Sequence, residues 1–276
     1  MTHAVTARPT AALAETLGRC AEIEIEHLGV GLRLGRPAEP GWLTRADALE
    51  PDVLEDLLAR VGRGAGSGKR SVQGTWLLEA YAGALVVPAV LGALTEGRVP
   101  DVDSGNVAVR FDDEGEATGV AFARPLGAIL AGDEAAGDPL AAVVADRAAL
   151  WGWFRRRLVG HLEPLVEALR PVTRRGHRAL WASVEDTCSG YLDWLGESLG
   201  RGPEARAQAG LLLGVEPPLR GPAVFTEIAW SGGVEIVRER NGCCLSYARG
   251  GRDGRACFTC PRTTPEERLE RLEARA

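Results

Sequence analysis

The stretch WLLEAYAGALVVPAVLGAL, residues 76–94, is the most apolar part of the chain and decides its fold. A segment of this length could cross a bilayer on length alone. Glu79 and Pro88 interrupt it, however, and the run without charged residues begins only at Ala80. We therefore predict a helix that is buried in the core, with the other elements packed around it.

The composition is that of a globular protein with a large core. Apolar residues make up 45% of the 276-residue chain, so folding does not require disulfides. Lysine and arginine total 32 against 38 acidic residues, and the net charge of −6 argues against nucleic-acid binding. The N-terminal residues lack the apolar core of a secretory signal, so we expect a cytoplasmic protein without an integral membrane segment. Thiols stay reduced in that compartment.

Local patterns predict several elements in the first quarter of the chain. Residues 9–20 have the composition of a short helix. Alternating isoleucines and glutamates predict a strand over 21–27, and this strand could pair with a second one over 30–34. The pattern Thr44-x-x-Asp47 is typical of a capping box and predicts a helix that runs to residue 61.

The middle and the end of the chain combine hairpins with long helices. Alternating apolar residues around an acidic turn predict a hairpin over 106–123, and the stretch 139–200 is predicted to be helical. Glycine and proline are frequent over 200–222, which indicates a boundary. Two strands are expected next, at 224–230 and 234–240.

The whole pattern predicts an α+β fold that is mainly helical and carries small antiparallel hairpins. A last helix should begin after Thr264, where a capping residue precedes proline and two glutamates. We expect two regions, a mainly helical domain over 1–215 and a C-terminal region over 216–276.

Four of the six cysteines lie close together near the C-terminus, as an adjacent pair and a C-x-x-C motif. They are Cys243, Cys244, Cys257 and Cys260. Four thiols in one short segment are typical of a metal site, and thiolates favour zinc or iron–sulfur over harder metals. Of the other two cysteines, Cys188 falls on the apolar face of a predicted helix and is expected to be a small buried hydrophobe.

The spacing of the cysteines leaves three kinds of chemistry open: a [2Fe-2S] cluster, a zinc site, and redox-sensing thiols. Zinc ribbons usually carry two C-x-x-C knuckles. Successive side chains of an extended backbone diverge, so an adjacent pair such as Cys243-Cys244 chelates a single ion awkwardly. A two-iron cluster distributes its four ligands over two metal centres and tolerates the arrangement better.

The segments GCCLSY at 242–247 and CFTCP at 257–261 resemble the C-terminal signature of the FhuF-like ferric-siderophore reductases. That family has the motif C-C-x10-C-x2-C, whereas this chain has twelve residues between the second and third cysteines. The extra residues fall in a glycine- and arginine-rich loop that can bulge outward at little entropic cost. The similarity extends over most of 60–265, where the long apolar helix, the hairpin and the later helical stretch occur in the family's order.

The resemblance implies a [2Fe-2S] cluster bound by Cys243, Cys244, Cys257 and Cys260. It thus implies a substrate-binding domain over 1–215 and a C-terminal iron–sulfur-binding region over 216–276. It also implies a reductase that converts siderophore-bound Fe(III) to Fe(II), taking electrons from a donor such as a ferredoxin or a flavin reductase. Neither the siderophore nor a catalytic residue can be identified from the sequence. Two alternatives remain: a non-enzymatic helical binding module with a structural zinc site of four cysteines, and an iron–sulfur electron carrier or sensor.

Other residues could act near the cluster or the substrate, although each also has a plain structural explanation. The arginines that flank the cysteines could raise the cluster's potential, or could belong to a solvated face; they are Arg240, Arg249, Arg252, Arg255 and Arg262. Tryptophans of the helical region could line a pocket, but core positions are commoner; these are Trp151, Trp153, Trp181 and Trp194. The run Arg155-Arg156-Arg157 is expected to be a solvated helix face. The histidines lack ligand spacing with the cysteines and are expected to be structural or exposed; they are His3, His27, His161 and His177.

Overall fold

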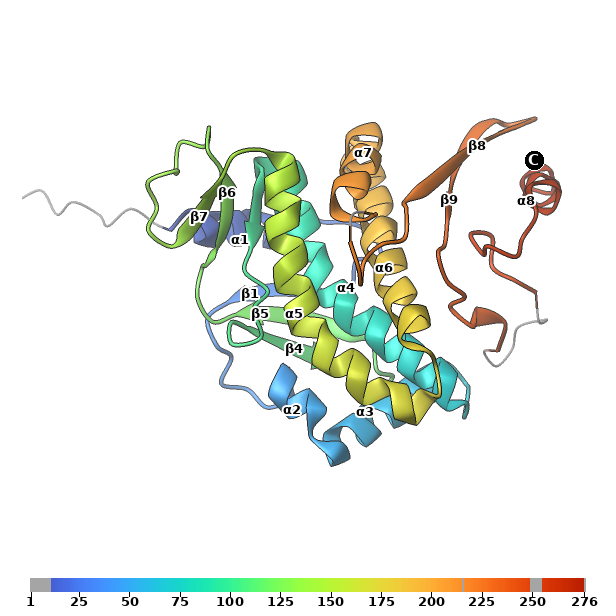
Figure 1. Ribbon diagram of the computed structural model, residues 1–276, viewed down its shortest axis with the longest axis horizontal. Coiled ribbons are helices and arrows are strands. Elements are labelled where there is room, and N and C mark those ends of the chain that lie inside the picture. Colours follow the sequence, from blue (N-terminus) through green and yellow to red (C-terminus); the bar gives the residue numbers. More distant parts are fainter. Residues whose placement is uncertain (1–10, 215, 249–254, 276) are drawn as a thin grey trace, which may run out of the picture.

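The computed structural model describes residues 11–214, 216–248 and 255–275, and about half of the chain is helical. The predicted mainly helical α+β class is therefore confirmed. Helix α4 (Arg70–Glu96) crosses the centre of the protein, between α5 (Arg147–Thr173) and α6 (His177–Ser198) (Figure 1). By length and composition α4 could span a membrane, but 89% of its most apolar window is buried inside the protein. The prediction of a core helix is confirmed.

The three long helices pack closely because glycines of α4 face side chains of its neighbours. A Cβ atom at Gly83 would lie 2.9 Å from the Tyr191 ring on α6. One at Gly74 would lie 2.1 Å from the Thr173 side chain on α5. Pro88 remains inside α4, which continues to Glu96 and ends at Gly97 with φ of 69°. Glycine adopts that left-handed conformation without strain, which makes it the usual residue after a helix end.

A mixed four-stranded sheet lies beside the helices, with the strand order β1-β5-β4-β2. The strands are β1 (Gly31–Leu34), β2 (Trp42–Thr44), β4 (Val107–Phe111) and β5 (Ala117–Phe122). The predicted hairpin over 106–123 is confirmed as β4 and β5, which pair antiparallel. The turn of this hairpin packs closely against α3 (Pro51–Gly64). Glycine permits the close approach, because Gly115 in the turn has φ of 80° and a Cβ atom there would clash with Val61.

The predicted strand over 21–27 is wrong. Helix α1 (Ala12–Glu22) extends into this stretch, and the residues after it form a turn in which His27 has φ of 65°. The alternation does mark burial, since Ile23 and Ile25 are half-buried and the glutamates between and beside them are exposed. The alternating stretch does not become a strand, because β1 occupies the place beside β5 and pairs with it in parallel.

The predicted helix after Thr44 begins as expected but is divided in two. Thr44 and Asp47 form the capping box of α2 (Arg45–Leu49). Pro51 then starts α3, and Glu50 before it is extended, with ψ of 130°. A residue that precedes proline avoids the helical conformation, which explains the break.

The predicted helical stretch 139–200 is wrong in its first residues. Strand β7 (Ala141–Val144) pairs in parallel with β6 (Gly127–Leu130), and β6 pairs with β3 (Arg98–Pro100) in a three-stranded sheet. Helices α5 and α6 follow, separated by a turn in which Arg174 has φ of 55°. Cys188 is completely buried on α6, as predicted.

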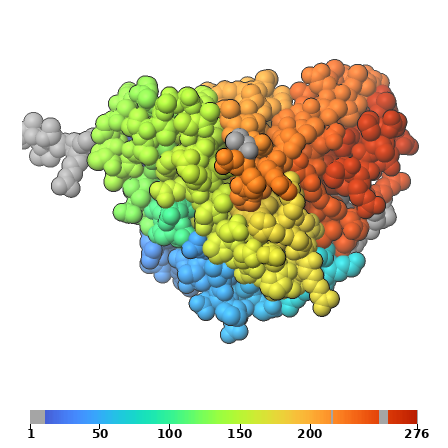
Figure 2. Space-filling model, viewed as in Figure 1, coloured from blue at the N-terminus to red at the C-terminus, as the bar shows by residue number. Residues whose placement is uncertain are grey.

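The stretch 200–222 contains helix α7 (Gly202–Leu212), which packs on α6 and so belongs with the helical part of the chain. The two strands after it are confirmed as β8 (Val224–Trp230) and β9 (Gly233–Glu239). The 3-10 turn η1 (Ser246–Ala248) and helix α8 (Pro265–Glu273) complete the chain, and α8 has the predicted cap at Thr264. These elements gather at one end of the protein (Figures 1 and 2).

The C-terminal elements have a small apolar cluster of their own. Ile228 of β8, Val237 of β9 and Leu272 of α8 are buried together, and Trp230 and Phe258 pack against them. The main core, in contrast, is built around α4, α5 and α6. The cysteine segments between β9 and α8 are thus supported from two sides.

His161 on α5 lies fully inside the main core, in the structural role expected of it. Its Nε2 lies 3.0 Å from the Tyr81 hydroxyl and its Nδ1 lies 2.6 Å from the Val102 carbonyl oxygen. Burial lowers the pKa of His161 to about 4 from its ordinary 6.5. The folded protein therefore keeps this imidazole neutral under conditions in which the unfolded chain protonates it.

This difference predicts a loss of stability in mild acid. The unfolded chain binds a proton at His161 below about pH 6.5, whereas the folded protein does so only near pH 4. The free energy of unfolding should fall across that interval by about 3 kcal/mol from this group. Urea denaturation between pH 4 and pH 7 measures the effect. His161→Gln should flatten the pH dependence, and an unchanged slope in that variant would contradict the assignment.

Candidate metal centre and adjacent cleft

The structure brings together the two predicted cysteine segments. The Cys244 and Cys257 sulfur atoms lie 3.9 Å apart, although thirteen positions separate the residues in sequence. Cys260 is buried at the end of a turn, in which its N–H donates to the Cys257 carbonyl oxygen at 3.0 Å. The other member of the adjacent pair, Cys243, is half-buried. The loop that connects the two segments includes residues 249–254, which lie outside the described residues, as do the predicted positions Arg249 and Arg252.

Helix α6 and its neighbours hold the first cysteine segment by its main chain. The Asp186 carboxylate accepts hydrogen bonds from the Asn241 N–H at 2.6 Å and the Gly242 N–H at 3.0 Å. The Trp76 indole N–H of α4 donates to the Cys244 carbonyl oxygen at 2.7 Å. Arg175, in the turn before α6, donates to the Cys243 carbonyl oxygen at 3.2 Å. The cysteine pair is therefore fixed to rigid helices.

Arg268 of α8 holds the second cysteine segment. Its side chain is only 2% exposed, and it donates to the carbonyl oxygens of Phe258 at 3.1 Å and Cys260 at 3.0 Å. It also forms an ion pair of 2.8 Å with Glu239 at the end of β9. The Thr263 hydroxyl adds a hydrogen bond of 2.9 Å to the Cys257 carbonyl oxygen. A buried guanidinium with several acceptors is costly to remove.

The two facing thiols have pKa values shifted in opposite directions. The hydrogen bond with Cys244 lowers the pKa of Cys257 to about 6, and the Thr259 hydroxyl contributes in the same direction. The same hydrogen bond, together with burial, raises the pKa of Cys244. A thiolate is the form of cysteine that binds metals. The structure places the Cys244 and Cys257 sulfurs in contact, and among the described residues it does not gather three or more of the four cysteine sulfurs into one group. In chemistry, four soft sulfur donors match a four-thiolate group, either iron–sulfur or zinc.

A cluster of charged side chains lies next to the cysteines. Arg240 forms ion pairs with Glu79 at 2.5 Å and with Asp186 at 3.2 Å, and Arg238 lies 3.6 Å from Asp186. Burial raises the pKa of Asp186 and raises that of Glu79 to about 7, against the opposing effect of Arg240 in both cases. Arg240 is thus largely compensated by carboxylates. The other described arginines of the predicted set, Arg255 and Arg262, are exposed.

A cleft of about 370 Å³ opens beside these charges. Aromatic side chains of α4 and α6 form its walls, and the β4–β5 turn forms part of its rim. Trp76 and Arg240 line it and also contact the cysteine region, the first through Cys244 and the second through Asp186. The cleft and the cysteine site are therefore neighbours.

The predicted tryptophans divide between the core and this cleft. Trp151 and Trp181 are completely buried, and Trp153 packs under the Arg157 guanidinium at 5.3 Å. Trp194 lines the cleft, as does Trp76, which was not among the predicted pocket residues.

Two of the three arginines that were predicted to form a solvated helix face are exposed. Arg156 and Arg157 are exposed, and Arg157 lies 3.4 Å from Asp101 in an ion pair. Arg155 is half-buried and donates a hydrogen bond of 3.1 Å to the Leu212 carbonyl oxygen, which ties α5 to α7.

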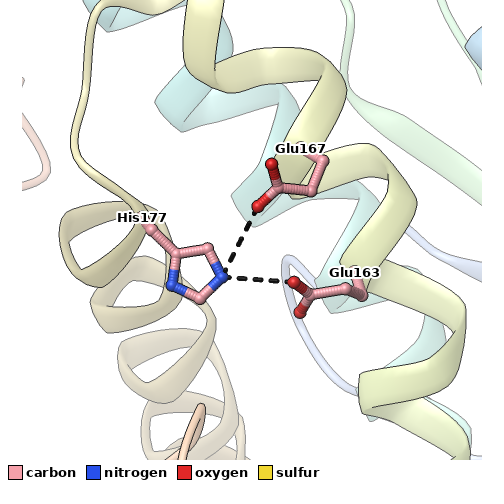
Figure 3. A group of neighbouring side chains, drawn as sticks. All are labelled: Glu163, Glu167 and His177. Atoms are coloured by element: carbon pink, nitrogen blue, oxygen red, sulfur yellow. Dashed lines mark hydrogen bonds and ion pairs between the residues drawn. The ribbon is translucent and has the colours of Figure 1, made fainter.

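His177 forms a separate polar group with two glutamates of α5. Its Nε2 lies 3.2 Å from a Glu163 oxygen and 3.7 Å from a Glu167 oxygen (Figure 3). All three side chains are half-exposed, and Glu167 also forms an ion pair of 2.7 Å with Arg170. We interpret the group as a set of ion pairs that joins α5 to the start of α6. His27 is exposed, and His3 lies outside the described residues.

Comparison with known proteins identifies the family to which this chain belongs. A family model described as "Ferric iron reductase FhuF-like transporter" matches residues 75–221, which extend from α4 past α7. The match covers more than half of the chain, so the protein belongs to the FhuF-like ferric iron reductase family. No curated protein matches the chain. The matched region ends before the cysteines, so their assignment as ligands depends on the residues themselves.

Sequence patterns did not reveal the groups that hold the cysteine loops. Asp186 is the clearest example, because it is completely buried although it lies on the side of its helix opposite Val184 and Cys188. A carboxylate on the polar side of an amphipathic helix is ordinarily exposed, so its position gave no signal of burial. Arg268 had no signal either, since arginines are frequent throughout α8 and its flanks.

Arg268→Ala tests the anchoring of the second cysteine segment. Loss of the guanidinium leaves buried carbonyl oxygens without a donor, each at a cost of about 1–3 kcal/mol. The variant should bind substoichiometric metal and lose it faster to a chelator, as measured by metal analysis and chelator competition. Arg262→Ala, at an exposed position near the same turn, is the matched control. Equal metal retention in the two variants would contradict the role of Arg268.

Proposed function

We propose that this protein is a cytoplasmic ferric-siderophore reductase whose [2Fe-2S] cluster is bound by the four C-terminal cysteines. The observation that carries the proposal is the 3.9 Å approach of Cys244 to Cys257, which joins the adjacent pair to the C-x-x-C motif. Membership of the ferric iron reductase family supports the substrate class. We further propose that residues 1–215 bind the substrate and that 216–276 form the iron–sulfur region.

The surroundings of the cysteine pair favour a two-iron cluster over a single zinc ion. Cys244 is buried whereas Cys243 is half-buried, as expected if the two side chains point in different directions. Leu245 follows them with φ of 60°, so the backbone turns sharply at this point. Divergent ligands suit two metal centres better than one.

The reaction needs one electron for each iron. A cellular donor, such as a ferredoxin or a flavin reductase, is oxidised by one electron, and the chelated Fe(III) is reduced to Fe(II), which hard oxygen donors bind less tightly. The bound cluster would supply the one-electron carrier between them. The chain's own contribution is to hold four thiolates on rigid loops and to place donors such as the Thr259 hydroxyl, 3.9 Å from the Cys257 sulfur, near them. Hydrogen bonds to sulfur raise the potential of such groups.

Spectroscopy of protein purified without oxygen tests the cofactor. We expect visible absorption that bleaches on reduction, an EPR signal in the reduced state, and equal amounts of iron and sulfide. Serine at any of the four C-terminal cysteines should abolish or alter these signals. Cys20→Ala and Cys188→Ala, at buried positions away from the site, are the controls and should keep the wild-type spectrum. Stoichiometric zinc without sulfide would overturn the assignment.

Turnover tests the reductase activity separately from the cofactor. Protein reduced under anaerobic conditions should transfer its electron to a ferric siderophore, and a colorimetric Fe(II) chelator should trap the released iron. Reoxidation of the protein and Fe(II) formation should proceed at the same rate, because one electron is transferred per iron. An intact cluster that releases no iron from any chelate tested would indicate an electron carrier instead.

A further inference from the structure

We propose that a ferric chelate bound in the cleft slows the loss of metal from the cysteine site. Trp76, Asp186 and Arg240 transmit the effect, because each lines the cleft and also holds the main chain of a cysteine segment. The proposal rests on the reductase function proposed above, and it assigns a place to the substrate of that reaction.

Trp76 is the most direct connection between the cleft and the cysteines. Its half-buried side chain on α4 lines the cleft, and its indole N–H donates to the Cys244 carbonyl oxygen at 2.7 Å. One side chain therefore reaches from the cleft to a candidate metal ligand. A molecule that packs against this ring restricts the movement of the Cys244 main chain.

Asp186 connects the cleft to the first cysteine segment from α6. It lies in the wall of the cleft, and its carboxylate accepts hydrogen bonds from the Asn241 N–H at 2.6 Å and the Gly242 N–H at 3.0 Å. A buried carboxylate is costly once such donors leave. Movement of the segment away from α6 therefore disturbs the wall of the cleft.

Arg240 extends the connection to the second cysteine segment. It lines the cleft, where its guanidinium forms ion pairs with Glu79 at 2.5 Å and with Asp186 at 3.2 Å. Its main-chain N–H donates to the carbonyl oxygen of Thr259, inside the C-x-x-C motif, at 2.9 Å. The wall of the cleft thus contacts both cysteine segments.

The remaining wall of the cleft offers aromatic surface to a ligand. Tyr191 and Trp194 of α6 are half-buried, and their rings lie 5.8 Å apart with a tilt of 44°. Rigid aromatic surfaces bind ligands with little loss of side-chain entropy. The metal-binding oxygens of a chelate point inward, so its outer surface is largely carbon. The cleft volume of about 370 Å³ falls in the range of small-molecule sites.

These contacts predict the size of the effect. Metal loss requires the cysteine segments to move apart, and this movement breaks the hydrogen bonds to Trp76 and Asp186. A ligand that binds only the closed arrangement suppresses opening in proportion to the ratio of its concentration to its Kd. At a ligand concentration of about ten times Kd, metal loss should therefore be about tenfold slower.

The test measures metal loss from the holoprotein to an excess of a colorimetric chelator, without oxygen. The ligand is the redox-inert gallium(III) complex of a trihydroxamate, whose coordination matches that of the iron(III) complex. Calorimetry first gives its Kd for the holoprotein. Protection is then the ratio of the rates of metal loss without and with the gallium complex. We expect it to rise with the concentration of that complex, whether the cysteines hold iron or zinc.

Trp76→Phe separates the two contacts of this side chain, because phenylalanine keeps an aromatic ring and lacks the N–H donor. The variant should bind the gallium complex with nearly unchanged Kd. Its protection should fall from about tenfold to about threefold, since one hydrogen bond contributes a factor of this size.

Trp194→Ala tests the position of the ligand. This variant should bind the gallium complex more weakly, whereas its metal loss without the complex should match that of the wild type. The matched control is Trp153→Ala, which removes another half-buried tryptophan, on α5 and away from the cleft. The control should keep wild-type binding and protection.

The outcomes separate this inference from the proposed function. Failure of the gallium complex to bind, or normal binding by Trp194→Ala, would overturn the position of the site. Binding without protection, or full protection in Trp76→Phe, would overturn the coupling. Fe(II) formation from the iron(III) complex without protection would retain the reductase and reject this inference. Protection without Fe(II) formation would retain the coupling and reject the reductase.

Discussion

The site depends on the hydrogen bonds by which Asp186 holds the main chain of Asn241 and Gly242. One completely buried carboxylate on α6 accepts both N–H groups and pairs with Arg240, so it joins the helical core to the first cysteine segment. Burial of an acid without such partners would be prohibitively costly. Its geometry therefore fixes where the loop leaves β9, and with it the position of Cys243 and Cys244.

Asp186 also connects the cleft to the cysteine site. Asp186 lines the cleft on one side and holds the cysteine loop on the other. Trp76 of α4 also contacts both places: its side chain lines the cleft, and its indole N–H donates to the Cys244 carbonyl oxygen. Helices α4 and α6, most of whose length the family model also covers, thus set the distance between the cleft and the cysteine site.

Elements whose formation depends on residues close in sequence were predictable. The apolar run of α4, the β4–β5 hairpin, and the caps at Thr44 and Thr264 all appear as expected. One error, the predicted strand over 21–27, arose where partners distant in sequence decide. Such a stretch becomes a strand only if a neighbour offers hydrogen bonds, and here β1 takes that place beside β5. The candidate ligands were visible from spacing, but the cleft was not, because its lining comes from elements that are far apart in sequence.

The burial of Cys20 and Cys188 determines which thiols of the protein are oxidised first. Cys20 and Cys188 are 1% and 0% exposed within helices, and burial raises the pKa of both. Oxidants act on accessible thiolates, so damage concentrates at the C-terminal sulfurs. These sulfurs lie on loops outside the main helical core, which does not need them to hold together. Air would therefore inactivate the proposed metal centre first, while the helical core stays folded.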